Sequence, residues 1–315
     1  MMIKALFLSA ALAGTAAAAP LGVEVAVPGP QGPLAGTLVD PGKDAPAMLI
    51  IPGSGPTDRD GNNPLGVKGA PYRQLAEALA ARGVATLRVD KRGMFGSKAA
   101  IADVGTTTIA DYAADAHAWI DMLRKRTDRS CVWILGHSEG SLVALRAAQD
   151  PSGICGLILL AGAGRPEGEA MRAQLRQNPA NASILPQAEA AIDQLEAGKH
   201  VSAESLPAPL QRVFADRVQS FLIDSFAYDP ARLIAAVKLP VLIVQGDHDL
   251  QIMVADAELL KRGQPAATLK LLPGVNHMLK PVTGDSPAAN VATYGDAGLA
   301  IASAVPDTIA AFVRK

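Results

Sequence analysis

The sequence predicts an α/β protein whose mostly parallel sheet is covered by helices on both faces. Short apolar runs rich in Val, Ile and Leu alternate with longer segments of helical spacing along most of the chain. The strand-like runs are almost continuously apolar, which is typical of parallel strands that are buried on both faces. The chain has 315 residues with 49% hydrophobic content, which is enough for a sizeable core.

The first half of the chain begins with a predicted antiparallel hairpin. Residues 23–27 and 34–39 are two short alternating runs, separated by a Pro- and Gly-rich turn. Further strands are predicted at residues 48–51, 84–89, 132–135 and 157–160. Helices are predicted at residues 72–82, 108–126 and 141–149. The second of these helices is entered through threonines, which can cap it.

The rhythm changes at residues 164–237, where helical patterns follow one another without a convincing strand. These patterns lie at residues 167–177, 188–197 and 210–226. We predict a helical lid inserted over the carboxyl edge of the sheet, where substrates enter; ordinary covering helices are the alternative. Its apolar residues either line a substrate channel or form the lid's own packing face. They are Leu206, Leu210, Val213, Phe214, Phe221, Leu222 and Phe226.

The strand and helix pattern then resumes. Strands are predicted at residues 240–245 and 268–272, and helices at 254–262 and from about 302 to 313. The predicted core domain therefore comprises residues 20–163 and 238–315.

The first 19 residues have the pattern of a secretory signal peptide. A short positive region ending at Lys4 precedes an apolar run, and small residues with Ala-x-Ala spacing end at Ala19. We expect the mature chain to be exported, to the periplasm or the medium. No later apolar run of about 18 residues would anchor it in a membrane.

Composition excludes some partners and leaves the cysteines undecided. The formal net charge of −1 gives no basic field for nucleic acid, and 4% aromatic content gives few stacking platforms for bases. The two cysteines, Cys131 and Cys155, start neighbouring predicted strands. Export permits a disulfide between them, and two buried free thiols are the alternative.

The central motif is Gly136-His137-Ser138-Glu139-Gly140, a G-x-S-x-G between a buried-type strand and an Ala- and Leu-rich helix. Such a strand, tight turn and helix lifts Ser138 above the carboxyl edge of the sheet. The helix N-terminus beside it favours a developing negative charge. Ser138 is therefore the candidate nucleophile; a serine that merely caps the helix is the alternative.

The chain resembles the α/β-hydrolases over nearly the whole mature sequence, through PGSGPTDRDGN (52–62), DKRGMFGS (90–97), GHSEG (136–140), QGDHDLQI (245–252) and GVNHMLK (274–280). The first segment is similar to that of a bacterial esterase subgroup related to serine aminopeptidases and prolyl oligopeptidases. The resemblance implies an α/β-hydrolase fold with a triad in the order Ser, Asp, His.

The base and the acid of the triad come from two late loops. A serine hydroxyl needs a base to take its proton, and His277 follows the last strand, where it can lie over Ser138. His248 is the rival but lies too close to the acid strand. Asp247 and Asp249 both follow the strand at 240–245. The turn geometry and the family's Gly-x-x-Asp pattern, from Gly246, favour Asp249.

The oxyanion hole requires two N–H donors. One is expected from the backbone of Glu139, which follows the nucleophile. The other is expected from the loop after the strand at 48–51, where Ser54 is the first choice and Gly55 the second. The side chain of Glu139 is expected to be solvated or salt-bridged, unless it binds a substrate amine.

No metal or cofactor motif is present. The loop that starts Asp58-Arg59-Asp60 fails as a calcium loop, because its sixth position is Asn63 and its twelfth is Gly69. We interpret it as a structural loop with paired Asp and Arg. No Cys/His cluster suits zinc and no dinucleotide fingerprint follows a strand, so we expect no cofactor.

Three functions remain open. The first is an exported serine esterase that hydrolyses small or medium acyl esters, small-molecule substrates, through an acyl-enzyme intermediate. The second is a serine aminopeptidase or related peptidase, in which Glu139, Glu167 or Glu169 would hold the free amine of the substrate. The third is a non-catalytic binding module on a hydrolase fold, although no triad residue is missing. The oligomeric state stays undetermined.

Overall fold

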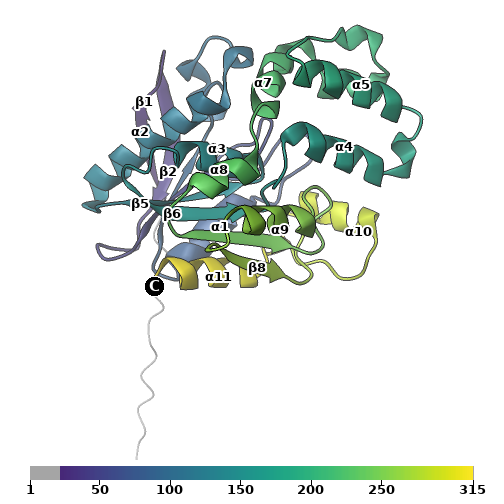
Figure 1. Cartoon of the computed structure of the whole chain (residues 1–315). Helices are drawn as coiled ribbons and strands as arrows, with labels where there is room; N and C mark the ends of the chain where they lie inside the picture. The colour runs from purple at the N-terminus through teal and green to yellow at the C-terminus, as the bar shows by residue number, and fades with distance from the viewer. Residues whose placement is uncertain (1–21, 315) are drawn as a thin grey trace, which may run out of the picture.

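The computed structural model describes residues 22–314, and the predicted signal peptide, residues 1–19, lies outside them. An eight-stranded sheet in the order β1-β2-β4-β3-β5-β6-β7-β8 forms the centre (Figure 1). The strands are β1 Val23–Pro28, β2 Pro33–Val39, β3 Ala47–Ile51, β4 Ala85–Val89, β5 Val132–His137, β6 Ile154–Leu160, β7 Val241–Gly246 and β8 Thr268–Leu272. The antiparallel hairpin of β1 and β2 and the mostly parallel sheet are as predicted, and β2 also pairs antiparallel with β4.

Helices cover both faces of the sheet. The first face carries α1 (Pro71–Ala80) and α11 (Ala304–Val313), whose apolar side chains pack with Met48 and Ile50 of β3. The opposite face carries α2 (Ile109–Thr127), α3 (Glu139–Ala147) and α9 (Val254–Gly263), which pack with Leu49 and Ile51. The alternation along β3 follows from the two-residue period of a strand. Because both faces are buried, this strand contains no polar residue.

The segment between β6 and β7 holds five α-helices: α4 Glu167–Gln177, α5 Leu185–Glu196, α6 Ala208–Val213, α7 Asp216–Phe226 and α8 Pro230–Ala236. In Figure 1, α4, α5 and α7 project beyond the end of the sheet. This segment, residues 164–237, is called the lid segment below. It has its own apolar core, which includes Leu210, Phe214, Leu222 and Phe226. These side chains form a packing face of the lid segment.

The prediction of one continuous helix at 210–226 in the lid segment is wrong. The pattern at 210–226 predicted a single helix, but the chain breaks between α6 and α7. The fully buried side chain of Gln219 donates to the carbonyl of Phe214, at 2.8 Å, and to that of Val201, at 2.9 Å. The first bond satisfies a carbonyl at the break that a continuous helix would have satisfied itself, and the second joins α7 to the preceding loop. The helix α8, which begins with Pro230 and is capped by Asp229, was not predicted.

Short helical elements complete the chain. They are α10 Pro287–Ala292 and the 3₁₀ helices Phe95–Ala100, Val104–Thr106, Pro179–Asn181, Ala203–Ser205 and Thr293–Gly295. α2 has the predicted threonine cap, because Thr108 accepts from the backbone N–H of Asp111 and Asp111 accepts from that of Thr108. Within residues 22–314, no helix combines the length and apolarity that a membrane span requires.

Cys131 and Cys155 form a disulfide. Cys131 directly precedes β5, Cys155 lies near the start of β6, and Val132 is paired with Ile154 between them. The bond therefore joins the amino ends of two neighbouring parallel strands. Ser138 lies at the opposite, carboxyl end of β5, so the disulfide is remote from it.

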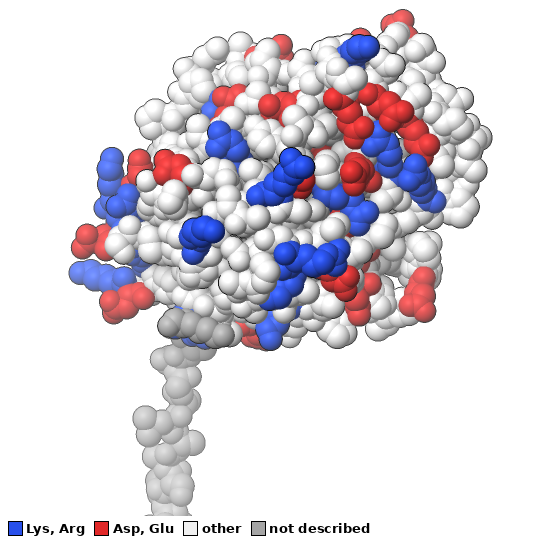
Figure 2. Space-filling view, in the orientation of Figure 1, with Lys and Arg blue, Asp and Glu red and all other residues white. Residues whose placement is uncertain are grey.

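Charged side chains of both signs are interspersed over the face shown in Figure 2. On the lid segment, Arg172 of α4 pairs with Asp193 and Glu196 of α5. Such pairs at the surface contribute little to stability each, and here they link α4 with α5.

Candidate active site

Ser138 occupies a strained turn between β5 and α3. Its φ of 53° and ψ of −123° lie outside the regions that a non-glycine residue normally adopts. The flanking glycines allow this turn. A Cβ on Gly136 would lie 2.1 Å from the carbonyl oxygen of Gly140, and one on Gly140 would lie 2.4 Å from that of Ile51. The close approach of the backbones therefore requires both glycines of the G-x-S-x-G.

His277 and Asp249 form a buried pair at the same end of the sheet. The Nδ1 atom of His277 lies 2.8 Å from Oδ2 of Asp249, and their side chains are 2% and 1% exposed. The other carboxylate oxygen accepts from the backbone N–H groups of Gln251, at 2.7 Å, and Ile252, at 2.9 Å. Burial alone would raise the pKa of Asp249, but the charge of His277 and these hydrogen bonds hold it below its ordinary value.

The rival residues lie elsewhere. Asp247 accepts from Nδ1 of His248 and from the backbone N–H of Gly274, both at 2.7 Å, and its side chain is 42% exposed. The histidine of α2, His117, lies 3.1 Å from the carbonyl oxygen of Ala147. The turn thus separates the two aspartates, and only Asp249 reaches His277.

His137 connects the sharp turn at residues 136–140, called the elbow below, with the loop that carries His277. Its Nε2 donates to the carbonyl oxygen of His277, at 2.9 Å, so its Nδ1 accepts from the hydroxyl of Tyr72, at 2.7 Å. The Tyr72 hydroxyl in turn accepts from the backbone N–H of Gly53, at 3.1 Å. Burial lowers the pKa of His137 to about 3, and the charge of His277 adds to the shift. A neutral His137 therefore holds the His277 loop next to Ser138.

The two predicted oxyanion-hole residues lie beside Ser138. Ser54, Ser138 and Glu139 line one cavity. Glu139 is the first residue of α3, where a backbone N–H has no acceptor within the helix. A Cβ on Gly53, the residue before Ser54, would lie 3.2 Å from Cβ of Ser138. The loop after β3 therefore passes directly over the elbow.

The side chain of Glu139 is paired with Lys91, a residue for which the sequence predicts no role. Nζ of Lys91 lies 2.8 Å from Oε1 of Glu139, and both side chains are 4% exposed. From the sequence, the Glu139 side chain is expected to be either solvated or salt-bridged, unless it binds a substrate amine. The structure shows the salt bridge, and the solvated side chain is wrong. Lys91 belongs to the segment DKRGMFGS. Three charged residues there directly follow a strand-like run, at the edge of the sheet where the site is expected, and this is the signal that could have pointed to Lys91.

The cavity beside Ser138 is small and mixed in character. Its volume is about 150 Å³, below the roughly 300–1,000 Å³ of sites for drug-sized ligands. Its apolar lining consists of Leu142, Ala163, Ala170, Met171, Pro230 and Ile252. Glu167 of α4 also lines it, and its Oε2 is buried without a hydrogen-bond partner among residues 22–314. Burial and the nearby Glu139 raise the pKa of Glu167 to about 7.

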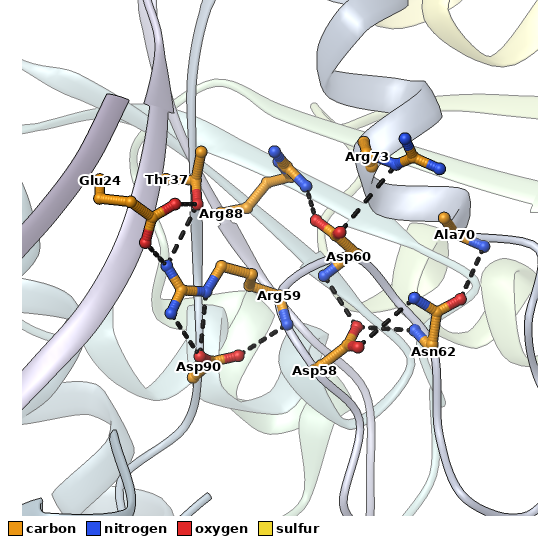
Figure 3. A network of polar contacts seen from close by, with 10 residues as sticks. All are labelled: Glu24, Thr37, Asp58, Arg59, Asp60, Asn62, Ala70, Arg73, Arg88 and Asp90. Carbon is orange, nitrogen blue, oxygen red and sulfur yellow. Dashed lines mark hydrogen bonds and ion pairs between the residues drawn. The ribbon is translucent and has the colours of Figure 1, made fainter. Parts of the chain in front are cut away.

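The loop at 58–63 is held by arginines, as Figure 3 shows. The Arg59 guanidinium and its backbone N–H both donate to Asp90, the residue after β4. Asp60 pairs with Arg88, and Asp58 accepts from the backbone N–H groups of Asp60 and Asn62. The carboxylates are thus occupied within the protein. In the described part of the chain, no group of three or more His, Cys, Asp or Glu side chains is placed to hold a metal.

Comparisons with known proteins give a family and a relative. The family model described as "Serine aminopeptidase, S33" matches residues 66–280, more than half of the chain. The matched region contains Ser138, Asp249 and His277. Esterase EstD of Thermotoga maritima is 27% identical over 243 residues, which are 74% of this chain and 54% of EstD. The chain therefore spans about half the length of that relative.

Solved structures show the same fold. The Pyrococcus furiosus esterase Pf2001 matches with a TM-score of 0.57 at 15% identity, over 93% of this chain and 92% of that one. Est1E from Butyrivibrio proteoclasticus matches with a TM-score of 0.56 at 17% identity, over 93% and 99%. A thermophilic esterase from Thermogutta terrifontis matches with a TM-score of 0.55 at 18% identity, over 93% and 98%. The chain therefore has the α/β-hydrolase fold.

Proposed function

The chain belongs to the serine aminopeptidase S33 family, and we propose that it is an exported serine hydrolase that cleaves small carboxylic esters. Ser138 is the nucleophile, His277 the base and Asp249 the acid. The observation that carries the proposal is the buried hydrogen bond between His277 and Asp249 at the carboxyl edge of the sheet, linked to the strained turn of Ser138 by the bond from His137 to the His277 carbonyl.

The protonation of His277 follows from its partner. Asp249 is ionised, because its pKa is below the ordinary value. Its carboxylate therefore accepts a hydrogen bond from Nδ1 of His277, so the proton of the neutral imidazole lies on Nδ1. The proton-free Nε2 can then take the proton of the Ser138 hydroxyl as the oxygen attacks the ester carbonyl carbon. The resulting tetrahedral intermediate expels the alcohol, which receives the proton from Nε2. Water then hydrolyses the acyl-enzyme by the same two steps and releases the acid.

The charge that develops on the carbonyl oxygen needs donors. The backbone N–H groups of Ser54 and Glu139 are the proposed pair, because both residues line the cavity with Ser138. The N-terminus of α3 adds a favourable dipole at the same place. A cavity of only about 150 Å³, with apolar side chains in part of its lining, favours a short acyl group.

One observation supports a second candidate, a peptidase that binds a free amine. Glu167 lines the cavity, and its Oε2 is buried without a hydrogen-bond partner among residues 22–314. A substrate ammonium would satisfy this oxygen. Glu139 is a poorer candidate because Lys91 already neutralises it, and Glu169 is exposed. An aminopeptidase would therefore use Glu167.

Two features support export. The amino-terminal pattern of residues 1–19 is that of a signal peptide. The disulfide between Cys131 and Cys155 is of a kind that persists in oxidising compartments. Detection of the chain in the periplasm or medium, with its N-terminus near Ala19 or Pro20, tests this part; an intact N-terminus found only in the cytoplasm contradicts it.

The enzymatic proposal is tested by substrate comparison. Hydrolysis of p-nitrophenyl acyl esters of increasing chain length is compared with hydrolysis of aminoacyl p-nitroanilides. We expect the short esters to be the better substrates; a strong preference for the anilides, lost in Glu167→Gln, establishes the peptidase instead. Ser138→Ala should abolish turnover and fluorophosphonate labelling with an unchanged circular dichroism spectrum. A wild-type protein that is neither labelled nor active is a binding module.

A further inference from the structure

Lys91 is a buried cation directly beside the proposed site. It lies two residues after the end of β4, and its side chain is 4% exposed. Nζ donates to the carbonyl oxygen of Gly53 and to Oε1 of Glu139, at 2.8 Å each, and lies 5.2 Å from the ring centroid of Tyr112. Lys91 does not line the cavity. A substrate in this cavity therefore does not touch Lys91, which can act on it only through its hydrogen-bonded partners and through its charge.

The first partner is the carbonyl of the Gly53–Ser54 peptide. A trans peptide is planar, and its C=O and N–H point in opposite directions. The direction of the Gly53 carbonyl therefore determines the direction of the Ser54 N–H. The preceding N–H, that of Gly53, donates to the Tyr72 hydroxyl at 3.1 Å. The Gly53 residue is thus held from both of its polar groups.

The second partner is the side chain of Glu139, whose backbone N–H is the other proposed oxyanion donor. One ammonium group therefore joins the loop after β3 to the first turn of α3. These two segments are 86 positions apart in the sequence, between Gly53 and Glu139. The two hydrogen bonds of Lys91 thereby link the peptide that carries the Ser54 N–H to the residue that carries the Glu139 N–H. The Glu139 carboxylate also balances the charge of the buried ammonium.

We propose that Lys91 is a positioning residue of the oxyanion hole, which aligns the Ser54 N–H through the Gly53 carbonyl and sets its distance from the Glu139 N–H. The proposal rests on the proposed function. A charged donor on the Gly53 carbonyl also polarises the peptide, which makes its N–H a stronger donor. An aligned and polarised N–H stabilises the tetrahedral intermediate more than the planar ester. Lys91 therefore acts on the transition state.

The test compares Lys91→Met with Arg92→Met. Arg92 is the matched control, because it is the next residue, is equally buried, and pairs with Asp111 and Asp115 of α2 away from the elbow. With a short p-nitrophenyl ester, we expect Lys91→Met to lower kcat by about 10- to 100-fold at little change in KM, somewhat less than the loss of a whole oxyanion donor. Arg92→Met should lower stability without lowering kcat.

A second readout separates positioning from a structural role. A trifluoromethyl ketone forms a tetrahedral adduct with the serine, so its affinity should fall in Lys91→Met by the same factor as kcat/KM. Unchanged affinity and kcat in a folded Lys91→Met overturn the proposal, and so does an equal loss of kcat in Arg92→Met.

If Lys91→Met does not fold, Lys91→Gln replaces it. Gln keeps an NH₂ donor group without the charge, and kcat and adduct affinity are expected to fall together by a smaller factor. If neither falls, the proposal is overturned. Ser138→Ala distinguishes the two levels of failure. Full ester hydrolysis by that variant refutes the proposed function, whereas its inactivity beside an unaffected Lys91→Met refutes only the role of Lys91.

Discussion

Asp249→Asn tests the choice of the triad acid most directly. Oδ1 of Asp249 accepts the two backbone N–H groups of the turn, and Oδ2 accepts from Nδ1 of His277 and from Nε2 of Gln245. An asparagine keeps its own Oδ1 on the backbone donors, so its NH₂ group takes the place of Oδ2. The NH₂ group then faces the imidazole, and both are donors.

The imidazole resolves this conflict by carrying its proton on Nε2. Nε2 then has no lone pair to accept the Ser138 proton, so the base is lost while the geometry is kept. The same tautomer change in another serine hydrolase costs about 10⁴ in rate, which corresponds to about 5.4 kcal/mol of activation free energy. We expect a loss of this size for Asp249→Asn, because the bond to His277 is buried and no water can replace the lost acceptor.

Asp247→Asn is the control in the same turn. Asp247 lies two residues earlier, is 42% exposed and binds His248 and the N–H of Gly274 through one oxygen that asparagine retains. Its kcat/KM should stay within about fivefold of the wild type, since an exposed pair is worth about 1 kcal/mol or less. The assay is kcat/KM on a short p-nitrophenyl ester, with thermal unfolding as the check on folding. Reversed effects, or a tenfold or smaller loss in a folded Asp249→Asn, refute the assignment.

Three further predictions concern stability. Glu167 binds its proton more tightly in the folded chain, so its contribution to stability is complete below its ordinary pKa near 4.5 and is lost as the pH rises to about 7. In urea unfolding, the free energy of unfolding of Glu167→Gln should therefore rise relative to that of the wild type between pH 4.5 and pH 7. The pKa of His137 falls from 6.5 to about 3 on folding, so its contribution is present above pH 6.5 and is lost on acidification by about 1.4 kcal/mol per pH unit; His137→Gln should lack this slope, and an equal slope in both proteins contradicts the buried neutral imidazole. Replacing Cys131 and Cys155 by serine should lower the free energy of unfolding by about 3 kcal/mol, from the loop-closure entropy across a separation of 24 residues, without lowering kcat.

The sequence by itself determined the elements whose signal is local. A strand buried on both faces must be apolar throughout, so β3, β5 and β7 were predicted within a few residues. The glycines around Ser138 are required wherever a strand turns this sharply into a helix. The positions of Ser138, Asp249 and His277 after three strands follow from the same logic, because the carboxyl ends of parallel strands share one edge.

Only the tertiary structure decided what depends on residues far apart in the chain. The exchange of β3 and β4 in the sheet order has no local signal. The break between α6 and α7 depends on Gln219, whose amide group bonds carbonyls outside its own turn. Lys91 had no predicted role, because its two partners, Gly53 and Glu139, are 38 and 48 positions away. Helical spacing and apolar runs report the neighbours of a residue in the chain, whereas a buried ion pair depends on which strand ends the fold brings together.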